Sequence, residues 1–287
     1  MSVPWIVMRS RNDAAILPRT LAGLRAQRHP FRLLVLDNAS NDGSTALVRA
    51  AADRVVDIPD GAYVPGRVLN LGMRETDGER VVFLNSDCVP LHADWLETLL
   101  AGFDAPGVDA VFGRQVARSD CLPLFSKDTE ETFGDGRAHA RWRHCFSMAA
   151  SAIRRETWEA LPFDESLRYS EDVDWTWRAR LRGGSIRYVA GARVEHSHNY
   201  SLAQYYRRQR GEGEAEAHIF RWSAWESSWL RYSLLPFARQ VLGDLKFAVR
   251  RGALSAALHS PALRLVQMLG RRAGFEEGRA HASGTVR

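Results

Sequence analysis

Residues 81–87 read Val-Val-Phe-Leu-Asn-Ser-Asp, an apolar run that leads directly into polar residues. The same change occurs in residues 33–38, Leu-Leu-Val-Leu-Asp-Asn, and in residues 5–9, Trp-Ile-Val-Met-Arg. Short, continuous apolar runs are typical of strands that are buried on both faces, as in parallel sheets. The three segments therefore predict three buried strands, each with polar residues at its carboxyl end.

Segments with helical spacing follow these predicted strands. Leucines recur at intervals of four and three within residues 17–24, after Asn12 or Asp13, either of which could cap the helix. Residues 44–52 and 95–103 have a similar pattern. Alternating strands and helices predict an α/β fold with a mostly parallel central sheet flanked by helices. Because ligands bind at the carboxyl ends of strands in such sheets, the polar residues there predict one crevice.

Two aspartates in this predicted crevice could bind a nucleotide and a cation. Asp37 could accept hydrogen bonds from a nucleobase N–H group or a ribose hydroxyl. Asp87 could bind a hard divalent cation that bridges two phosphates, although a single aspartate at a strand end is more often a turn residue. Asp42 and Ser44, in contrast, fit an Asx-type turn with a helix cap better than a ligand site.

Two later clusters could contribute a base and an imidazole ligand. Glu171 and Asp172 begin a helix-like segment, where the helix dipole alone would favour acids. In the functional interpretation, one of these carboxylates removes a proton from an acceptor hydroxyl. His196 and His198 would point to opposite faces of a continuing strand. One of them could complete a metal site begun by Asp87, and polar surface is the alternative.

Charge and cysteine content limit the class of protein. The net charge of +5 and the pI near 9.4 come almost entirely from arginine, since Lys127 and Lys246 are the only lysines. A basic surface favours phosphate-rich partners, and arginine-biased coding explains it equally well. The arginines are scattered and no nucleic-acid motif is present, so nucleic acid is not expected as a partner. Cys88, Cys121 and Cys145 are odd in number and far apart, which favours a reducing cytoplasm.

Membrane-spanning and export signals are not expected either. No apolar run approaches the roughly 20 residues that span a bilayer. Arg9 and Arg11 come where a signal peptide would need its apolar core. The expected location is cytoplasmic.

The order of these motifs resembles that of the family 2 glycosyltransferases, which have the GT-A fold, over residues 5–200. By this resemblance, Asp37 binds the sugar nucleotide. Residues 85–87, Asn-Ser-Asp, correspond to the metal-binding Asp-x-Asp motif of the family. Glu171 and Asp172 correspond to the Glu-Asp pair that contains the catalytic base.

Asn85 departs from the family pattern, which has an acid at this position. An amide can hydrogen-bond a ribose or a metal-bound water, but it adds no negative charge. Metal affinity is therefore expected to depend on Asp87 and a histidine.

A closer resemblance is to bacterial rhamnosyltransferase-like members of the family. It is carried by residues 9–13, 65–72, 112–115 and 195–201. It implies an activated 6-deoxyhexose donor such as dTDP-rhamnose, with another UDP- or GDP-sugar as the alternative. The acceptor would be a hydroxyl of a glycan or lipid-linked glycan in cell-surface polysaccharide synthesis.

The resemblance and the residue chemistry together predict an inverting, metal-dependent glycosyltransferase that uses Mg²⁺ or Mn²⁺. The predicted catalytic residues are Asp172 and Glu171. The predicted metal ligands are Asp87, His196 and His198. The predicted donor-binding residues are Arg9, Ser10, Arg11, Asn12, Asp37, Asn38, Arg67, Asn70, Asn85 and Ser86. Arg114 is a further candidate for donor binding. For Asn70, helix packing is the alternative role.

Two other classes of protein are alternatives. The neutral Asn85 would also suit a catalytically silent sugar-nucleotide-binding protein, although such a protein would need neither an acceptor base nor the histidines. A nucleotidyltransferase would also use carboxylates at an α/β nucleotide site. It would favour a glycine-rich loop after the first strand, whereas residues 9–12 contain no glycine.

The chain is expected to contain a catalytic domain at residues 1–205, with a nucleotide-sugar half at 1–115 and an acceptor half at 116–205. Residues 206–275 are rich in arginine and predict basic amphipathic helices, and residues 276–287 predict a disordered tail. The helices could dock on an anionic membrane, at the cytoplasmic face of the inner membrane, where a lipid-linked acceptor would be presented. A helical cap with solvated arginines is the alternative.

Overall fold

The computed structural model describes residues 3–136 and 146–282 of the chain. These residues form two compact units. The first, here called the sheet unit, consists of Met1–Arg118, Thr129–Leu167 and Glu171–Ser197. The second, the helical unit, consists of Ser119–Asp128, Arg168–Ser170 and His198–Arg287. Cys145, one of the three cysteines, lies outside the described residues.

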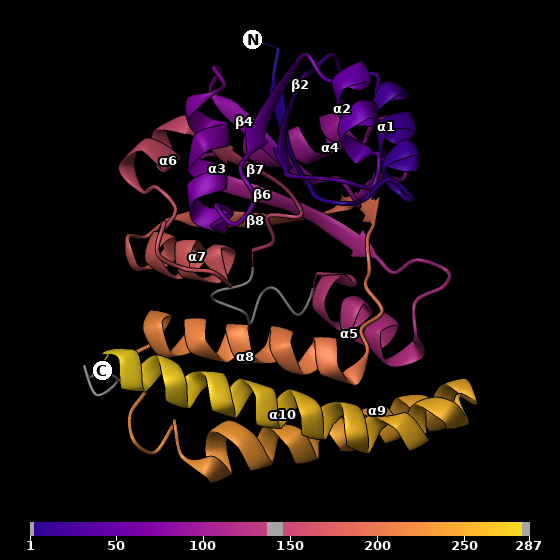
Figure 1. The fold of residues 1–287 in the computed structure, drawn as a ribbon, viewed down its shortest axis with the longest axis vertical. Coiled ribbons are helices and arrows are strands. Elements are labelled where there is room, and N and C mark those ends of the chain that lie inside the picture. The colour runs from indigo at the N-terminus through magenta and orange to yellow at the C-terminus, as the bar shows by residue number, and fades with distance from the viewer. Residues whose placement is uncertain (1–2, 137–145, 283–287) are drawn as a thin grey trace. The chain divides into compact units, whose positions relative to one another are not determined.

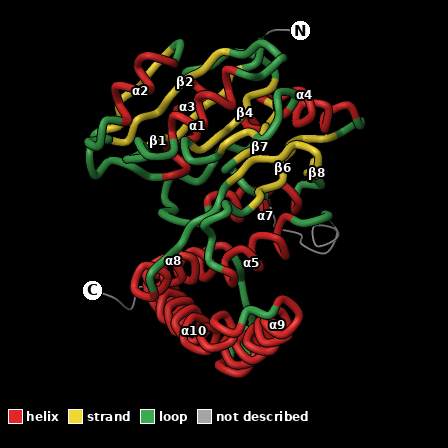
Figure 2. Tube along the Cα trace, turned by 90° about the vertical axis from the view of Figure 1, so that its right-hand side faces the viewer, coloured by secondary structure: helices red, strands yellow, loops and turns green. Residues whose placement is uncertain are grey.

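The sheet unit is built on an eight-stranded sheet in the order β3-β2-β1-β4-β7-β6-β8-β5. Figure 2 shows its strands in yellow and labels those from β2 to β8 in this order. Its strands are β1 Trp5–Ser10, β2 Arg32–Asn38, β3 Arg54–Ile58, β4 Arg80–Asn85, β5 Val89–Pro90, β6 Val108–Val116, β7 Ala150–Arg154 and β8 Ser185–Glu195. The three strands predicted from their apolar runs are β1, β2 and β4, and they are parallel neighbours. The sheet is mixed, because β7 is antiparallel to both β4 and β6 and β5 is antiparallel to β8.

Helices cover both faces of this sheet. They are α1 Leu17–Arg25, α2 Ser44–Ala51, α3 Pro65–Arg74, α4 Trp95–Leu100, α6 Arg155–Ala160 and α7 Glu171–Leu181. The helix predicted at residues 95–103 ends earlier, since Ala101–Asp104 form a 3₁₀ turn. The predicted cap of α1 by Asn12 or Asp13 is wrong, because the helix begins at Leu17 without a side-chain cap.

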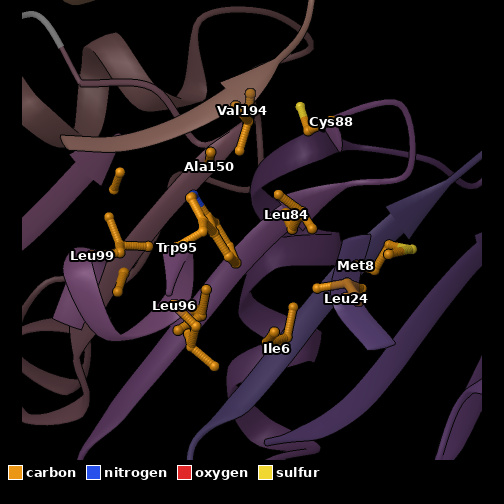
Figure 3. Close-up of a cluster of buried hydrophobic side chains, with 14 of the residues drawn as sticks. Ile6, Met8, Leu24, Leu84, Cys88, Trp95, Leu96, Leu99, Ala150 and Val194 are labelled. Atoms are coloured by element: carbon orange, nitrogen blue, oxygen red, sulfur yellow. The ribbon is translucent and has the colours of Figure 1, made fainter. Parts of the chain in front are cut away.

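The two hydrophobic cores follow from the alternation of side chains along the strands. From β1, Ile6 and Met8 pack on one face, with residues of α1, α2 and α4 (Figure 3). Trp5 and Val7 pack on the other face, with residues of α3 and α7. Each fully buried leucine in these cores contributes about 1.5–3 kcal/mol of hydrophobic stabilisation. The cores therefore hold the carboxyl ends of β1, β2 and β4 in fixed positions.

The helical unit contains α8 Leu202–Ile219, a π-helix at Trp229–Leu234, α9 Leu235–Arg251 and α10 Leu254–Ala282 (Figure 1). Glycines let α8 and α10 approach closely. A Cβ atom on Gly274 would lie 1.8 Å from the carbonyl oxygen of Arg210, and one on Gly213 would lie 2.0 Å from that of Arg271. Part of α5, Pro123–Phe133, also belongs to this unit.

Two predicted boundaries differ from the structure. The disordered tail expected from residue 276 is wrong for residues 276–282, which continue α10, and residues 283–287 lie outside the described part. The units divide between Ser197 and His198 rather than after residue 205, because the chain leaves the sheet after β8 and packs among helices. Within the described residues, no helix has both the length and the apolar character to cross a bilayer.

Candidate active site

The register of the sheet brings polar residues from three strands together. Ser10 of β1 lies opposite Asp37 of β2, and Arg9 of β1 lies opposite Asn85 of β4. All four residues stand at the carboxyl ends of parallel strands, where ligands bind in open α/β sheets. The sheet thus forms the polar edge that the strand patterns predicted.

Arg9 links two parts of this edge. Its Nε and Nη2 atoms donate to Asn85 Oδ1 at 3.1 and 2.9 Å, and its Nη1 atom donates to Glu171 Oε1 at 2.9 Å. Burial lowers the pKa of Arg9, but Tyr63 and Glu171 raise it to well above its ordinary value overall. The guanidinium therefore remains charged and holds the first residue of α7 against the end of β4.

Asp37 lies at the end of β2 and is only 2% exposed. Its carboxylate accepts hydrogen bonds from Ser40 Oγ at 2.6 Å and from Thr45 Oγ1 at 2.7 Å. Each oxygen retains a further lone pair for a ligand, so these bonds orient Asp37 without exhausting its acceptor capacity. The Asx-turn interpretation fits the following residues, since Asp42 Oδ1 accepts hydrogen bonds from the backbone N–H and the hydroxyl of Ser44.

The loops after β1 and β2 are tied to each other. Asn12 accepts a hydrogen bond from the Asn41 backbone N–H at 2.8 Å and donates its own backbone N–H to Ser40 Oγ at 3.0 Å. Asn12 and Ala39 have φ values of 55° and 49°, in the left-handed region that non-glycine residues adopt at a cost. Such strain is typical of loops whose shape is fixed by their contacts.

Two buried polar atoms at the strand ends have no hydrogen-bond partner in the part of the chain that the structure describes. They are Ser10 Oγ and Asn38 Oδ1, on residues that are 3% and 4% exposed. An unpaired buried polar group costs about 1–3 kcal/mol, which a ligand that supplies the missing bond would remove. Arg11, from the same loop as Asn12, is exposed and forms a 3.5 Å ion pair with Asp60.

Asp87 and His196 form the part of the site that could bind a metal. Asp87 Oδ2 lies 3.4 Å from His196 Nε2, and the other ring nitrogen, Nδ1, lies 2.7 Å from Gln115 Oε1. Gln115 Nε2 donates to Ser147 Oγ at 2.7 Å, so Gln115 Oε1 is the acceptor for the Nδ1–H of the imidazole. This tautomer leaves the Nε2 lone pair facing Asp87, and a carboxylate with an imidazole fits a divalent cation such as Mn²⁺.

Arg118 and Asp13 adjoin these residues. Arg118 Nη2 lies 3.4 Å from Asp87 Oδ2, and Asp13 accepts a short hydrogen bond from the hydroxyl of Ser86. Burial raises the pKa of Asp13, and the charge of Asp87 adds to the increase, against the opposing effect of the Ser86 bond. Asp13, Asp87 and Arg118 therefore add two acidic groups and a second guanidinium to the Arg9 guanidinium at the end of β4.

The two acids at the start of α7 have different surroundings. Glu171 is 9% exposed and is paired with Arg9. Asp172 is half-buried, and its Oδ1 atom accepts the backbone N–H of Val173 at 2.9 Å. Asp172 is thus the more accessible carboxylate, whereas Glu171 is held by an ion pair.

Among the described residues, Arg67 and Asn70 contact the segment that follows α6. Asn70 donates to the carbonyl oxygen of Phe163 and to Glu165 Oε1, both at 2.9 Å, and accepts from Trp158 Nε1 at 2.8 Å. Its amide anchors the segment after α6, which supports the packing alternative rather than donor binding. Arg67 is exposed and lies 3.7 Å from Glu165.

The sheet unit by itself supplies two of the three predicted metal ligands. His198 is the first residue of the last segment of the helical unit, where its ring centroid lies 5.5 Å from that of Tyr200. Arg114, the further donor-binding candidate, forms a surface ion pair with Glu130 at 2.9 Å.

Sequence reasoning did not assign site roles to Asp13, Tyr63, Gln115 and Arg118. Gln115 and Asp13 belong to the 112–115 and 9–13 motifs that carried the rhamnosyltransferase resemblance, so a signal for both was present. Tyr63 and Arg118 contact the site through partners that are 54 and 31 residues away in the sequence. No local sequence pattern predicts such contacts.

Comparisons with known proteins agree with this geometry. The profile described as Glycosyl transferase family 2 matches residues 5–160. The O-antigen chain rhamnosyltransferase RfbN of Salmonella typhimurium is 26% identical over 216 residues, which cover 71% of this chain and 69% of RfbN. The O-antigen chain rhamnosyltransferase WbaN of Salmonella anatum is 29% identical over 190 residues, which cover 62% of this chain and 60% of WbaN.

A solved structure shares the fold at low identity. The mannosyltransferase PcManGT from Pyrobaculum calidifontis, determined in complex with GDP-Man and Mn²⁺, superposes with a TM-score of 0.64. Its sequence identity is 18%, and the match covers 96% of this chain and 86% of the other. The likeness therefore concerns the fold.

Proposed function

The chain belongs to glycosyltransferase family 2 and has the GT-A fold, and from this premise we propose that it is an inverting enzyme that uses a nucleotide-diphosphate sugar. The match to the family confirms the resemblance to family 2 glycosyltransferases that the sequence predicted. The similarity to RfbN and WbaN confirms the closer resemblance to rhamnosyltransferases. The observation that carries the proposal is the 2.9 Å pair between Arg9 and Glu171. It joins the acidic start of α7 to the strand ends, so an acceptor base would stand beside the donor.

The donor would be bound by the ends of β1 and β2. The unpaired atoms of Ser10 and Asn38 and the oriented carboxylate of Asp37 could bind the nucleoside. Asp87 and His196 would hold a divalent cation. The cation, when bound, would offset negative charge on the departing diphosphate.

Asp172 would act as the base. As the acceptor hydroxyl forms its bond to the anomeric carbon, the bond from that carbon to the phosphate oxygen breaks, and the hydroxyl proton moves to the Asp172 carboxylate. The electron pair of the broken bond leaves with the nucleotide. Attack from the face opposite the leaving group inverts the anomeric configuration, and no covalent sugar–enzyme intermediate forms.

L-Rhamnose from dTDP-rhamnose is the proposed donor sugar. The support is the similarity to RfbN and WbaN, which are described as rhamnosyltransferases. The proposed acceptor is a glycan or lipid-linked glycan at the cytoplasmic face of the membrane. A sugar-nucleotide-binding protein without transfer activity is the second candidate, and the neutral Asn85 favours it.

A donor panel tests the proposal. The purified chain would be incubated with dTDP-rhamnose, UDP-glucose and GDP-mannose, with and without Mn²⁺, and free nucleotide would be measured. We expect release with dTDP-rhamnose that requires the metal. If a donor binds but no nucleotide is released in the presence of a glycan acceptor, the second candidate is favoured. If nucleotide is released only from another donor, that donor replaces dTDP-rhamnose in the proposal.

A further inference from the structure

A cavity of about 250 Å³ opens inside the helical unit, and none of its lining residues is assigned to transfer. Its walls come from the end of α8, the π-helix at 229–234, the start of α9 and the middle of α10. Trp222, Phe237 and Met268 provide apolar walls. π-Helical segments are rare and often occur at functional sites, so the position of this one beside a cavity suggests a ligand.

Polar groups with unused capacity face this cavity. Ser233 lines it and is 3% exposed, and its hydroxyl has no hydrogen-bond partner among the described residues. Arg231 also lines the cavity, is exposed, and forms no ion pair within the described part of the chain. A hydroxyl and a guanidinium are donors that together suit an anionic oxygen group.

The one acidic residue of the lining is already neutralised. Glu216 accepts hydrogen bonds from Arg271 Nε at 2.9 Å and from Tyr232 Oη at 2.6 Å, and a second Arg271 nitrogen also contacts it. Burial raises the pKa of Tyr232 well above its ordinary value, so this phenol stays a neutral donor. No acid of the lining therefore compensates the charge of Arg231, and the lining has a net positive charge. Glu226, which is exposed and outside the lining, interacts with Arg231 electrostatically.

The surface around the cavity is apolar. Exposed side chains on the same segment are Trp225, Trp229, Leu230, Leu234 and Leu235, with exposed fractions between 46% and 59%. Tryptophan and leucine beside arginine are typical of segments that lie in the interface of an anionic membrane. A soluble anion would need no such apolar surround.

We propose that this cavity binds the phosphate group of an anionic membrane lipid, with Arg231 and Ser233 as donors and the surrounding tryptophans and leucines in the interface. The inference rests on the proposed function in one respect only: lipid binding would hold the enzyme where a lipid-linked acceptor is presented. Vesicle binding needs no sugar donor, so the two proposals can fail separately.

Vesicle flotation of the full chain tests the site. The vesicles would be phosphatidylcholine alone or phosphatidylcholine with phosphatidylglycerol, and binding is expected only with the anionic lipid. Arg231→Lys keeps the charge but loses the planar donor fork, and we expect it to weaken binding about tenfold. The matched control, Arg250→Lys on the exposed end of α9, should bind as the unchanged chain does.

Three further measurements separate the outcomes. Ser233→Ala should also weaken binding, and thermal unfolding of each variant would show that the helical unit is intact. Equal effects of the two lysine variants, or equal binding to both kinds of vesicle, would overturn the proposal. Binding of free inorganic phosphate that Arg231→Lys abolishes, without binding of the chain to either kind of vesicle, would assign the cavity to a soluble phosphate and contradict lipid binding.

Discussion

The side-chain oxygen of Asn85 accepts two hydrogen bonds from Arg9, at 3.1 Å from Nε and 2.9 Å from Nη2. The guanidinium uses its remaining nitrogen for Glu171, so one arginine satisfies an amide from β4 and a carboxylate from α7. A second carboxylate at position 85 would compete with Glu171 for this cation. The geometry thus gives a structural reason for a neutral residue where the family has an acid, and it leaves Asp87 as the charged group beside His196.

Arg9→Lys should weaken this connection without removing the charge. A lysine cannot reproduce the fork that reaches Asn85 and Glu171 together. We expect the free energy of unfolding to fall by about 2 kcal/mol, the size of a lost hydrogen bond to a charged group. Urea unfolding would measure it, with Arg11→Lys as the exposed control, and equal midpoints for the two variants would contradict the argument.

Gln115 is predicted to control metal affinity without binding the metal. Gln115→Leu removes the acceptor that orients His196 and should weaken Mn²⁺ binding by about 10- to 100-fold. Gln115→Glu keeps an acceptor and should restore much of the affinity. Mn²⁺ titration by electron paramagnetic resonance would compare both with Arg114→Gln, a neighbouring surface variant. Unchanged affinity in the leucine variant would remove Gln115 from this role.

The strand ends could be predicted from the sequence because burial imposes a local pattern. The apolar runs before Arg9, Asp37 and Asn85 reveal where the chain enters and leaves the core. Side-chain pairing across the site follows no such pattern. His196 meets Gln115 from 81 residues away, and Arg9 meets Glu171 from 162 residues away.

The motif that contains Asn70 fits both a donor-binding residue and a packing residue. In the structure, the segment after α6 satisfies hydrogen bonds of its buried amide, which favours the packing role. The antiparallel pairing of β7 with β4 and β6 was not predicted, because the sheet order depends on pairings between distant segments. Likewise, the extent of α10 is greater than predicted. Its glycines pack against α8, whereas glycine in a sequence pattern indicates a break in a helix.

Asp172→Asn should separate donor binding from transfer. The amide cannot take up the acceptor proton, so turnover is expected to fall by about 10²- to 10⁴-fold while donor affinity remains nearly unchanged. Glu171→Gln is the comparison, since the introduced amide could still accept a bond from Arg9, and its loss of turnover should be smaller. Transfer assays and calorimetric titration with the donor would measure both. Near-normal turnover in Asp172→Asn would remove it as the base.

The last prediction concerns a buried ionic network in the helical unit. Asp244 and Arg264 are 0% and 1% exposed, and Arg264 donates to both oxygens of Asp244 at 2.7 and 3.0 Å. Ser260 Oγ also donates to Asp244, at 2.7 Å, and Lys127 Nζ lies 3.2 Å from it. Burial alone would raise the pKa of Asp244, but the bonds from Arg264 and Ser260 lower it overall.

Asp244→Asn removes one of the two carboxylates that pair with Arg264, and Asp128 remains at 2.7 and 2.9 Å. We expect the variant to destabilise the unit by about 2 kcal/mol at pH 7, the size of a lost hydrogen bond to a charged group. Because the pKa of Asp244 is lower in the folded chain, its contribution is complete above the ordinary value of about 4 and is lost as the pH falls through the folded value. The difference in the free energy of unfolding between the original chain and the variant should therefore become smaller below about pH 4. Hydrogen exchange in α9 and α10 would measure this locally, with exposed Asp60→Asn as the control. Equal protection at pH 7 would show that the ion pair adds nothing beyond its neutral replacement.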